Sequence, residues 1–487
     1  LFYFNKGICK TTMKVLFINN VLGSDCIGRV PLGVLYISAA LRKDGHETDI
    51  VDTRHFKNII KKIEDYNPAV LLFSLRTASN QLYINLNRRI KSDYPEVFSI
   101  FGGPHATFYP QIIEGEKAID AVCVGEGEDA IIEFINRFEN GDEYHTTPNF
   151  WARRNGVVYK NSVRPLIGNI DNVSYPDREL LCSYPSVRDF PVRNFITTRG
   201  CPYSCTYCFN QAYNEIYKGL GKRVRRRSVD NVIVEIEEEY QRNPFQLVQF
   251  EDDIFVVPGK WLEDFSEKYR NTIGLPFTCN VRAELITEKE VSLIRDAGCV
   301  SVWIGVESGS EVVRKNLLKR NNTDSTTINC VKLLQSAGIY VATENILGLP
   351  ETTLDDDFKT FELNCVLRPG FANPSIYQPY PGTELGQRAS DAGIFSGNFD
   401  DIKNFYSTSS LNIKHRREVE NLQCLFSFCV EFPFLSSFLR KLVHLPLNFL
   451  YRGIQTLWRG YALTQRIIPV KLGIRQWLHV VRRSLGF

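Results

Sequence analysis

Residues 194–208 read NFITTRGCPYSCTYC, and this stretch decides the predicted fold of the chain. An apolar run typical of a buried strand leads into a loop that holds Cys201, Cys205 and Cys208. Most of the other ten cysteines lie alone, several of them inside apolar runs where a thiol packs as a small hydrophobic group. The three clustered cysteines therefore indicate chemistry rather than packing.

Three kinds of site compete for these cysteines. A structural zinc site needs four ligands, usually as two separated pairs, and no second pair lies nearby in the sequence. A redox pair needs only Cys205 and Cys208, which leaves Cys201 without a role. A cubane iron–sulfur cluster has four irons, so three thiolates on one loop would leave the fourth iron open to a small molecule. The spacing favours this third kind of site.

Downstream of the cysteines, short apolar segments alternate with longer amphipathic ones, a pattern typical of βα units around a parallel sheet. Helices are predicted at 229–241 after Ser228, at 287–297, and at 323–337 before Gly338. Six such units predict a partial TIM-type barrel, in which ligands bind at the carboxyl ends of the strands. The predicted strands cover residues 194–198, 247–251, 276–280, 300–305, 340–346 and 374–378.

Polar residues and glycines stand at the ends of several of these strands. They are Asp252 and Asp253 after the second strand, Arg282 after the third, Glu307 and Ser308 after the fourth, and Gly348 after the fifth. A helix cap or a turn would explain any one of them alone. In a barrel of this kind, however, ligands bind at the carboxyl ends of the strands, where all of these residues are predicted to lie.

The C-x3-C-x2-C motif, with Tyr207 before its last cysteine, resembles the signature of the radical S-adenosylmethionine superfamily. The resemblance implies a 4Fe-4S cluster held by Cys201, Cys205 and Cys208 as catalytic and metal-binding residues. It also implies that S-adenosylmethionine binds the open iron and is cleaved by one electron to a 5′-deoxyadenosyl radical. The implied S-adenosylmethionine contacts are Tyr207, Asp252, Asp253, Arg282, Glu307, Ser308 and Gly348.

The first 140 residues show a second alternation of strands and helices. Strands are predicted at residues 15–19, 48–51, 70–74, 98–101 and 121–124, with a helix at 31–42. Five strands with helices between them predict a doubly wound, Rossmann-like domain, which binds ligands in the crevice at its strand ends.

The glycine-rich loops of this domain resemble those of the cobalamin-binding domain that precedes the barrel in one branch of the superfamily. Glycines suit this role because they let the backbone approach a flat corrin closely. The implied cobalamin contacts are Pro31, Gly33, Ser74, Gly102, Gly103, His105, Thr107, Gly125, Glu126 and Gly127. The D-x-H-x-x-G motif of many cobalamin proteins is absent, so no cobalt ligand is predicted, and His46 is interpreted as a turn residue. A domain kept only for packing is the alternative.

Two further segments carry weaker signals. Residues 151–159 predict a hairpin with an Asn155-Gly156 turn, inside a linker at 141–192. The basic run 222–227 is interpreted as a solvated face, with one arginine reaching an anionic ligand, rather than as a nucleic-acid site.

The C-terminal region, residues 401–487, is predicted to be a helical extension. Residues 432–487 contain nine Lys or Arg and no Asp or Glu, interleaved with Phe, Leu, Trp and Ile. No run reaches the roughly 20 apolar residues that cross a bilayer. Two interpretations stay open: basic amphipathic helices lying on an anionic membrane surface, and a helical cap on the barrel with a cationic outer face.

The predicted chain is thus α/β, with a cobalamin-binding domain at 14–140, the linker at 141–192, a radical S-adenosylmethionine barrel at 193–400 and the extension at 401–487. The resemblance implies an enzyme that methylates an unactivated carbon, with methylcobalamin as the methyl donor. Alternatives are a cobalamin-dependent oxidative cyclase or ring-rearrangement enzyme, and a non-catalytic cobalamin sensor or carrier.

The expected partners follow from the same interpretation. They are a small-molecule substrate, with a lipid or isoprenoid as one class, and an electron donor such as flavodoxin or ferredoxin. The formal net charge of +3 is small for 487 residues, and no nucleic-acid partner is predicted. Because no signal peptide is recognised, we expect a reducing cytoplasmic location, with a peripheral contact to the inner face of the cell membrane left open.

Overall fold

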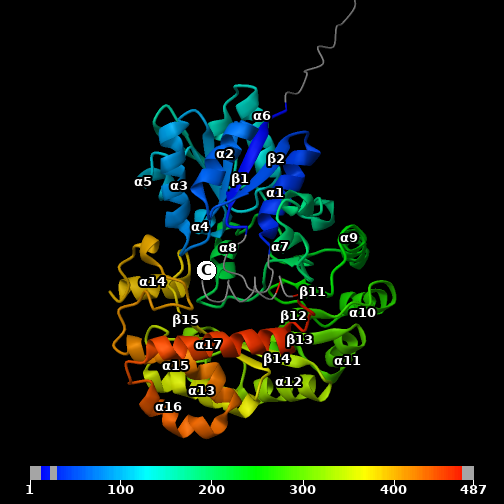
Figure 1. Cartoon of the computed structure of the whole chain (residues 1–487), viewed down its shortest axis with the longest axis vertical. Helices are drawn as coiled ribbons and strands as arrows, with labels where there is room; N and C mark the ends of the chain where they lie inside the picture. The colour runs from blue at the N-terminus through cyan, green and yellow to red at the C-terminus, as the bar shows by residue number, and fades with distance from the viewer. Residues whose placement is uncertain (1–11, 22–29, 474–475, 477–487) are drawn as a thin grey trace, which may run out of the picture. The chain divides into compact units, whose positions relative to one another are not determined.

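The structure is a computed structural model that describes residues 12–21, 30–473 and 476 (Figure 1). The part of the C-terminal extension at 474–475 and 477–487 therefore lies outside the described residues. The chain divides into two compact units. The first holds residues 12–21, 31–166 and 173–183, and the second holds residue 30, residues 167–172 and those from 184 onward.

The first unit is built on a sheet with the strand order β2-β1-β3-β4-β5-β6-β7. Neighbours among the first five strands pair in parallel, and the order reverses between β1 and β3, as in doubly wound folds. The strands are β1 Lys14–Asn19, β2 Glu47–Asp52, β3 Val70–Ser74, β4 Phe98–Gly102, β5 Ala121–Cys123, β6 Phe150–Arg154 and β7 Val157–Lys160. The helices are α1 Leu32–Lys43, α2 Phe56–Tyr66, α3 Asn80–Asp93, α4 Gly103–Phe108, α5 Ile112–Gly115 and α6 Glu128–Glu139.

Strand β1, which lies between β2 and β3, is buried on both faces of this sheet. Leu16 and Ile18 belong to a cluster completed by apolar residues of α2 and α3. Val15 and Phe17 point to the opposite face, where α1 and α6 pack beside each other. Burial on both faces explains why the central strands read as continuous apolar runs.

The predicted hairpin is confirmed, and it extends the sheet of the first unit. β6 pairs antiparallel with β5, and β7 pairs antiparallel with β6. Asn155 and Gly156 both have positive φ, 52° and 79°, as a two-residue turn between right-twisted strands requires.

The second unit contains a six-stranded sheet in the order β15-β14-β13-β12-β11-β8, with every neighbouring pair parallel. The strands follow one another in space as in sequence, so helices connect them as βα units. The strands are β8 Val192–Phe195, β11 Leu247–Phe250, β12 Phe277–Val281, β13 Cys299–Glu307, β14 Tyr340–Leu347 and β15 Phe371–Ile376. The connecting helices are α8 Phe209–Ile216, α9 Val229–Arg242, α10 Lys260–Thr272, α11 Glu288–Asp296, α12 Asp324–Ser336 and α13 Leu354–Leu367.

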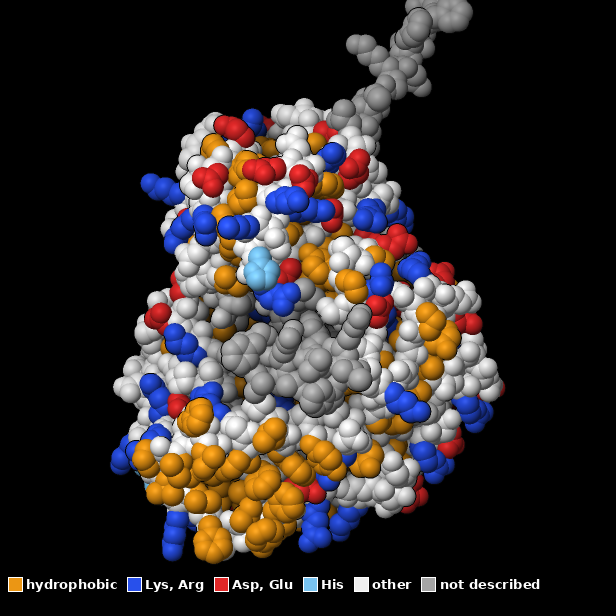
Figure 2. Space-filling model, in the orientation of Figure 1, with side chains coloured by type: hydrophobic (Ala, Val, Ile, Leu, Met, Phe, Trp, Pro, Cys, Tyr) orange, Lys and Arg blue, Asp and Glu red, His pale blue; other side chains and the backbone are white. Residues whose placement is uncertain are grey.

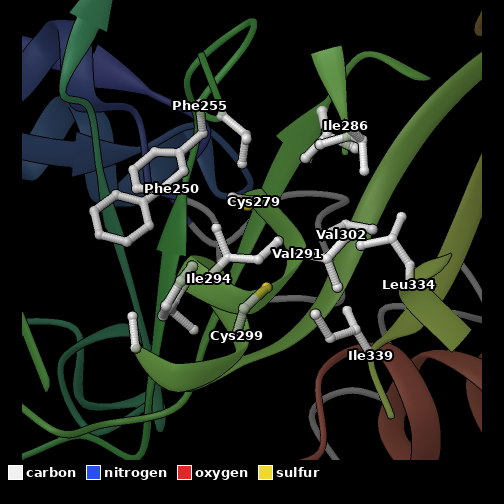
Figure 3. Close-up of a cluster of buried hydrophobic side chains, with 14 of the residues drawn as sticks. Phe250, Phe255, Cys279, Ile286, Val291, Ile294, Cys299, Val302, Leu334 and Ile339 are labelled. Carbon is white, nitrogen blue, oxygen red and sulfur yellow. The ribbon is translucent and has the colours of Figure 1, made fainter. Parts of the chain in front are cut away.

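The main core of the second unit lies between this sheet and its helices (Figure 3). Phe250, Cys279 and Val302 come from strands, and Ile294 and Leu334 come from α11 and α12. Ser228 begins α9 as predicted, because its side chain accepts a hydrogen bond from the Asn231 N–H. The predicted helices, and Gly338 with φ of 77° after α12, are confirmed to within a residue or two.

Most strand boundaries lie within two residues of the prediction, and two boundaries differ from it by three residues. The strand predicted at 194–198 ends at Phe195, because Thr197 turns its N–H to the Asp252 carboxylate instead of a neighbouring strand. The strand predicted at 374–378 begins at Phe371, and Pro374 lies inside it. Proline is tolerated there because β15 is an edge strand.

The interpretation of the basic run 222–227 as a solvated face is wrong for two of its arginines. The short strand β10 (Arg225–Arg226) pairs with β9 (Thr198–Arg199), which draws the run into the protein. Arg225 donates to the Ile167 carbonyl, and Arg227 donates to the Ile196 carbonyl and pairs with Glu235 at 2.5 Å. Both arginines are buried, so they stabilise the fold locally.

Helices after the barrel strands cover part of the second unit. They are α14 Glu384–Asp391, α15 Arg416–Glu431, α16 Ser436–Leu442 and α17 Asn448–Ala462. A short helix, α7 Pro185–Arg188, lies before the first barrel strand β8. Leu422, Phe426 and Cys429 of α15 pack on Leu347 and Ile376. In the described part of the chain, no helix is long and apolar enough to cross a membrane.

Candidate functional site

The three cysteines lie on the loop between β9 and α8, at the carboxyl edge of the parallel sheet. Gly200, directly before them, has φ of 85°, and a Cβ there would overlap the Arg223 carbonyl oxygen. The Cys208 N–H donates to the Cys205 carbonyl at 3.1 Å, and Cys208 then begins α8. Glycine is therefore required for the chain to enter this loop.

The environment of the sulfurs fits an iron–sulfur cluster. Asn210 Nδ2 lies 3.7 Å from Cys208 Sγ, and Arg282 Nη1 lies 3.8 Å from Cys205 Sγ, so two sulfurs have N–H donors. Burial raises the pKa of Cys208 to about 12 and also raises the pKa of Cys201. Buried thiols of this kind become thiolates when a metal replaces the proton, and hydrogen bonds to sulfur tune such clusters.

The cysteines are not arranged around a single ion. Within the described ranges, no three His, Cys, Asp or Glu side chains are placed to hold one metal ion. In a cubane cluster each thiolate binds a different iron, so the sulfurs stand further apart than around one metal.

Arg282 is held beside the cysteine loop from two sides. Its guanidinium stacks on the Tyr203 ring, with 3.5 Å from the guanidinium carbon to the ring centroid. Its Nε donates to Glu284 Oε1 at 2.7 Å. The side chain is buried, so it presents a fixed positive charge next to Cys205.

Tyr207 and Glu307 meet in a buried cluster that ties the cysteine loop to β13. The Tyr207 hydroxyl donates to Glu307 Oε1 at 2.8 Å, and Arg320 lies 3.4 Å from the same oxygen. Arg320 also donates to the Gly305 carbonyl at 2.7 Å. Burial raises the pKa of Glu307, whereas Arg320 lowers it. Arg320 was missed by the sequence analysis, because the polar stretch around it resembles an ordinary surface loop.

The two adjacent aspartates have different positions. Asp252 is buried, and its carboxylate accepts hydrogen bonds from the Thr197 N–H at 3.1 Å and the Thr197 hydroxyl at 2.7 Å. Burial raises the pKa of Asp252 to about 6. Asp253 reaches solvent, and its charge raises the pKa of Cys201 and Cys208. Asp253 therefore faces the cysteine loop, whereas Asp252 holds the segment after β8.

Ser308 and Gly348 end their strands in hydrogen-bonded turns. The Ser308 hydroxyl accepts from the Ser310 N–H at 3.2 Å, and the Ser308 carbonyl accepts from Arg314 at 2.6 Å. Gly348 has φ of 66°, and its N–H donates to the Asp357 carboxylate at 3.0 Å. Both residues lie at the same sheet edge as the cysteines, since they follow β13 and β14.

Asp357 makes the stability of the chain depend on pH. Burial raises its pKa to about 7, although the Gly348 N–H bond lowers it. The folded chain therefore holds this proton to a higher pH than the unfolded chain, and stability is lost as pH rises from about 4 to about 7. Relative to Asp357→Asn, we expect the wild type to lose on the order of 4 kcal/mol over this range. Urea denaturation at both ends of the range measures the difference.

The adjacent Asp356 provides a control, because its pKa is shifted in the opposite direction to that of Asp357. Although burial raises its pKa, hydrogen bonds from Lys359 and Thr353 lower it below its ordinary value overall. The contribution of Asp356 is therefore lost as pH falls below about 4, so Asp356→Asn changes only the acid side of the profile. A wild-type profile parallel to that of Asp357→Asn between pH 4 and 7 would contradict the prediction.

The predicted cobalamin contacts lie at the ends of strands β3, β4 and β5 and in or beside helices α1, α4 and α6 of the first unit. Ser74 ends β3, Gly102 and Gly103 join β4 to α4, and Gly125 follows β5 with φ of 82°. Thr107 Oγ1 accepts from the Gly125 N–H at 3.1 Å, which joins two of these loops.

The remaining predicted cobalamin contacts differ in how much free space surrounds them, and His46, which was interpreted as a turn residue, can be compared with them. A Cβ at Gly33, in α1, would have no atom within 4 Å. His105 is fully buried and its Nδ1 lies 3.0 Å from the Thr77 hydroxyl, so its imidazole is held in the interior. His46 is also buried at the turn after α1, with Nδ1 accepting from the Met13 N–H. Pro31, Glu126 and Gly127 complete the set at the starts of α1 and α6.

Gly103 is the most constrained of these glycines. Its φ is 86°, and a Cβ would lie 2.8 Å from the Leu75 oxygen and 2.9 Å from the Leu75 nitrogen. Gly45 has a similar φ of 97° with no atom within 4 Å of the Cβ position. We expect Gly103→Ala to lower the free energy of unfolding by about 2 kcal/mol more than Gly45→Ala, which shares only the backbone strain. Equal losses in urea denaturation would show that Leu75 does not limit the loop.

The fold and the cysteine loop together define a radical S-adenosylmethionine type of barrel accompanied by a Rossmann-like domain. Two family models match the chain: the B12 binding domain at residues 20–135 and the Radical SAM superfamily at residues 195–363. The chain therefore carries a B12-binding domain, which precedes a radical S-adenosylmethionine domain.

Curated relatives include both methyltransferases and cyclases. An uncharacterized methyltransferase of Pyrococcus horikoshii is 28% identical over 366 residues, covering 74% of this chain and 78% of the relative. The hopanoid C-3 methylase of Methylococcus capsulatus is 26% identical over 374 residues, covering 73% and 67%. The anaerobic magnesium-protoporphyrin IX monomethyl ester cyclase of Rubrivivax gelatinosus is 24% identical over 401 residues, covering 78% and 70%.

Solved structures share the fold at low sequence identity. OxsB, a cobalamin-dependent S-adenosylmethionine radical enzyme with aqua-cobalamin and S-adenosylmethionine bound, gives a TM-score of 0.64 at 16% identity. The match covers 98% of this chain and 84% of that one. The methyltransferase TsrM from Kitasatospora setae, with cobalamin and a 4Fe-4S cluster bound, gives 0.63 at 16% identity over 78% of each chain. The radical S-adenosylmethionine domain and the methyltransferase and cyclase relatives identify the chain as an enzyme, which sets aside the non-catalytic sensor or carrier.

Proposed function

We propose that this enzyme methylates an unactivated carbon of a small hydrophobic molecule, using a 4Fe-4S cluster, S-adenosylmethionine and cobalamin. One observation carries the proposal. The loop of Cys201, Cys205 and Cys208 lies at the same sheet edge as Asp253, Arg282 and Glu307, and two of its sulfurs have buried N–H donors. The family models and the methyltransferase relatives support the same conclusion.

In this proposal the residues of the second unit bind the iron–sulfur cluster and S-adenosylmethionine and orient them. The three cysteines hold the cluster, while Arg282 and Asn210 donate to the sulfurs and keep the loop in place. Asp253 is the acidic group open toward the loop, so we assign it, in place of Asp252, to the amino group of S-adenosylmethionine. Bound cofactors supply a carbon-centred radical and a methyl group, and the protein keeps water away from both.

Glu307 and Tyr207 have a positioning role in this scheme. Their hydrogen bond, supported by Arg320, fixes the cysteine loop against the end of β13. Ser308 and Gly348 shape the neighbouring strand ends through their turns. In the first unit, the loops at Gly102, Gly103 and Gly125 offer backbone without side chains, which suits the approach of a flat corrin.

A labelled-cofactor experiment tests the proposed function. Anaerobically reconstituted protein is incubated with labelled S-adenosylmethionine, cobalamin and a chemical reductant. We expect both S-adenosylhomocysteine, which reports methyl donation, and 5′-deoxyadenosine, which reports radical cleavage. The same incubation without cobalamin is the control, and it should retain only 5′-deoxyadenosine. Absence of both products would contradict the proposal.

Oxidative cyclisation is the second candidate function, because cyclase relatives cover a similar share of the chain. A cyclase would form 5′-deoxyadenosine without S-adenosylhomocysteine, so the same experiment separates the two. In either case we propose that flavodoxin or ferredoxin supplies the electron and that the chain works in a reducing, cytoplasmic environment.

A further inference from the structure

The outer side of the C-terminal helices is apolar where a surface helix is normally polar. We define the α16–α17 face by six exposed side chains: Phe434, Phe438, Leu447, Phe449, Leu450 and Leu457. Phe449 is 92% exposed, Leu457 78% and Phe434 71%. Figure 2 shows hydrophobic side chains gathered over this region, with Lys and Arg at its margins. A contiguous apolar patch of this kind usually marks an interaction surface.

The amphipathic pattern of α17 explains how this face arises. Tyr451 and Ala462 are buried, and Tyr451 packs in the core formed with α15. Leu450, Leu457 and Tyr461 are exposed at helical spacing, so they share one side of the helix, which is turned roughly 100° away from the side of Tyr451 and Ala462. The helix is thus apolar on both its inner and outer sides, and among the described residues of the second unit its inner side packs on α15.

The arginines of α17 are turned away from this outer face. Arg452 donates to Asn448 Oδ1 and to the Ser407 carbonyl, each at 2.6 Å. Arg459 stacks on Tyr406, with 4.1 Å from the guanidinium carbon to the ring centroid. In the part of the extension that the structure describes, the outer side of these helices is apolar with cations at its edges, which differs from the cationic outer face of the cap interpretation.

The charge around the face favours an anionic partner. Residues 432–487 contain nine Lys or Arg and no acidic residue. Arg440 is neutralised by Asp355 at 2.7 Å and Glu362 at 3.3 Å. Lys441 is exposed, and so is Arg368 in a groove of about 650 Å³ that also contains Pro433 and Arg466. Neither Lys441 nor Arg368 forms an ion pair with an acidic residue in the part of the chain that the structure describes.

The groove adjoins the α16–α17 face. Pro433 precedes Phe434 in the chain, and the Arg466 guanidinium lies 5.7 Å from the Tyr461 ring centroid. Arg466 itself is paired with Glu431 at 2.8 Å, so the available cation of the groove is Arg368. Apolar side chains and unneutralised cations therefore occur side by side on this surface.

We propose that the α16–α17 face docks the enzyme on an anionic lipid membrane. The exposed Phe and Leu side chains enter the boundary between headgroups and acyl chains, with α17 lying in the plane of the surface. Lys441 and Arg368 attract the phosphates of the headgroups, as basic residues beside an apolar helix do. This docking does not depend on the chemistry at the cysteine loop, so a failure of the docking proposal and a failure of the proposed function can be told apart.

Vesicle sedimentation with the full chain tests the proposal. We expect the wild type to pellet with vesicles of phosphatidylcholine and phosphatidylglycerol, and less with phosphatidylcholine alone. Leu457→Glu should weaken binding about tenfold or more, because one buried Leu side chain contributes roughly that factor. Lys441→Glu should weaken binding about fivefold or more on the anionic vesicles only. Phe449→Glu is a second apolar test at a site whose exposure leaves folding unaffected.

Matched controls lie in the first unit. Val157→Glu changes a side chain that is 55% exposed on β7, and Lys61→Glu reverses an exposed charge on α2. Both should bind vesicles like the wild type. Wild-type protein that stays in the supernatant with both vesicles would overturn the proposal, and so would equal losses in the control variants. A wild-type dimer that Leu457→Glu converts to a monomer would assign the face to a second copy and would also overturn it.

Discussion

Cys205→Ala is expected to abolish the cleavage of S-adenosylmethionine by the reduced, reconstituted enzyme. Each thiol of the loop holds a different iron in the proposed cluster, so losing one removes the site at which the cofactor is reduced. The variant should contain little iron and sulfide after anaerobic reconstitution, and 5′-deoxyadenosine should fall below detection. Chromatography of the products and analysis of iron and sulfide give the two measurements.

Cys365→Ala is the matched control for this loss. Cys365 is half-buried on α13 and has no place in the proposed site. It should keep its iron, its sulfide and its cleavage activity. Cleavage retained by Cys205→Ala would show that the cysteine loop does not hold the cluster.

Glu307→Ala should lower the free energy of unfolding by about 3 to 5 kcal/mol, as when one partner is removed from a buried ion pair. The variant leaves the guanidinium of Arg320 buried without its carboxylate and removes the acceptor of the Tyr207 hydroxyl. Because this cluster fixes the cysteine loop, we also expect weaker binding of S-adenosylmethionine. Urea denaturation and equilibrium dialysis of the cofactor measure the two effects.

Glu215→Ala is the corresponding surface control. Glu215 is 65% exposed and lies 4.0 Å from Lys218, so its loss should cost less than about 1 kcal/mol. If Glu307→Ala cost no more than this control, the Tyr207–Glu307–Arg320 cluster would have no structural role. Tyr207→Phe, which keeps the ion pair, should fall between the two variants.

The sequence predicts the fold well where periodicity and end signals agree. The six barrel strands are apolar runs buried in a parallel sheet, and Ser228 and Gly338 mark helix ends by their own local chemistry. The Asn155-Gly156 turn is equally local, because only residues that tolerate positive φ form it. None of these features requires knowledge of distant contacts.

The contacts of the candidate site are harder to predict, since they depend on which groups meet across the sheet edge. The sequence places Asp252 and Asp253 together but does not show that the Asp252 carboxylate accepts hydrogen bonds from Thr197. Arg320 lies 113 residues from Tyr207 and has no motif of its own. Arg225 and Arg227 look like surface charges until β10 pairs with β9 and buries them.

The outer face of α17 shows a third limit. Composition shows that the C-terminal region is basic and apolar, but it does not show which side of a helix has a partner. Only the packing of Tyr451 and Ala462 reveals that Leu457 points outward. A helix with apolar residues on two sides needs the rest of the fold to tell its core face from its free face.

The central claim is that three cysteines hold an iron–sulfur cluster whose fourth iron binds S-adenosylmethionine. Electron paramagnetic resonance of the anaerobically reconstituted and reduced protein tests it most directly. We predict the signal of a reduced 4Fe-4S cluster that changes when S-adenosylmethionine is added. Protein that binds zinc in place of iron and sulfide, or a cluster signal that S-adenosylmethionine leaves unchanged, would contradict the claim.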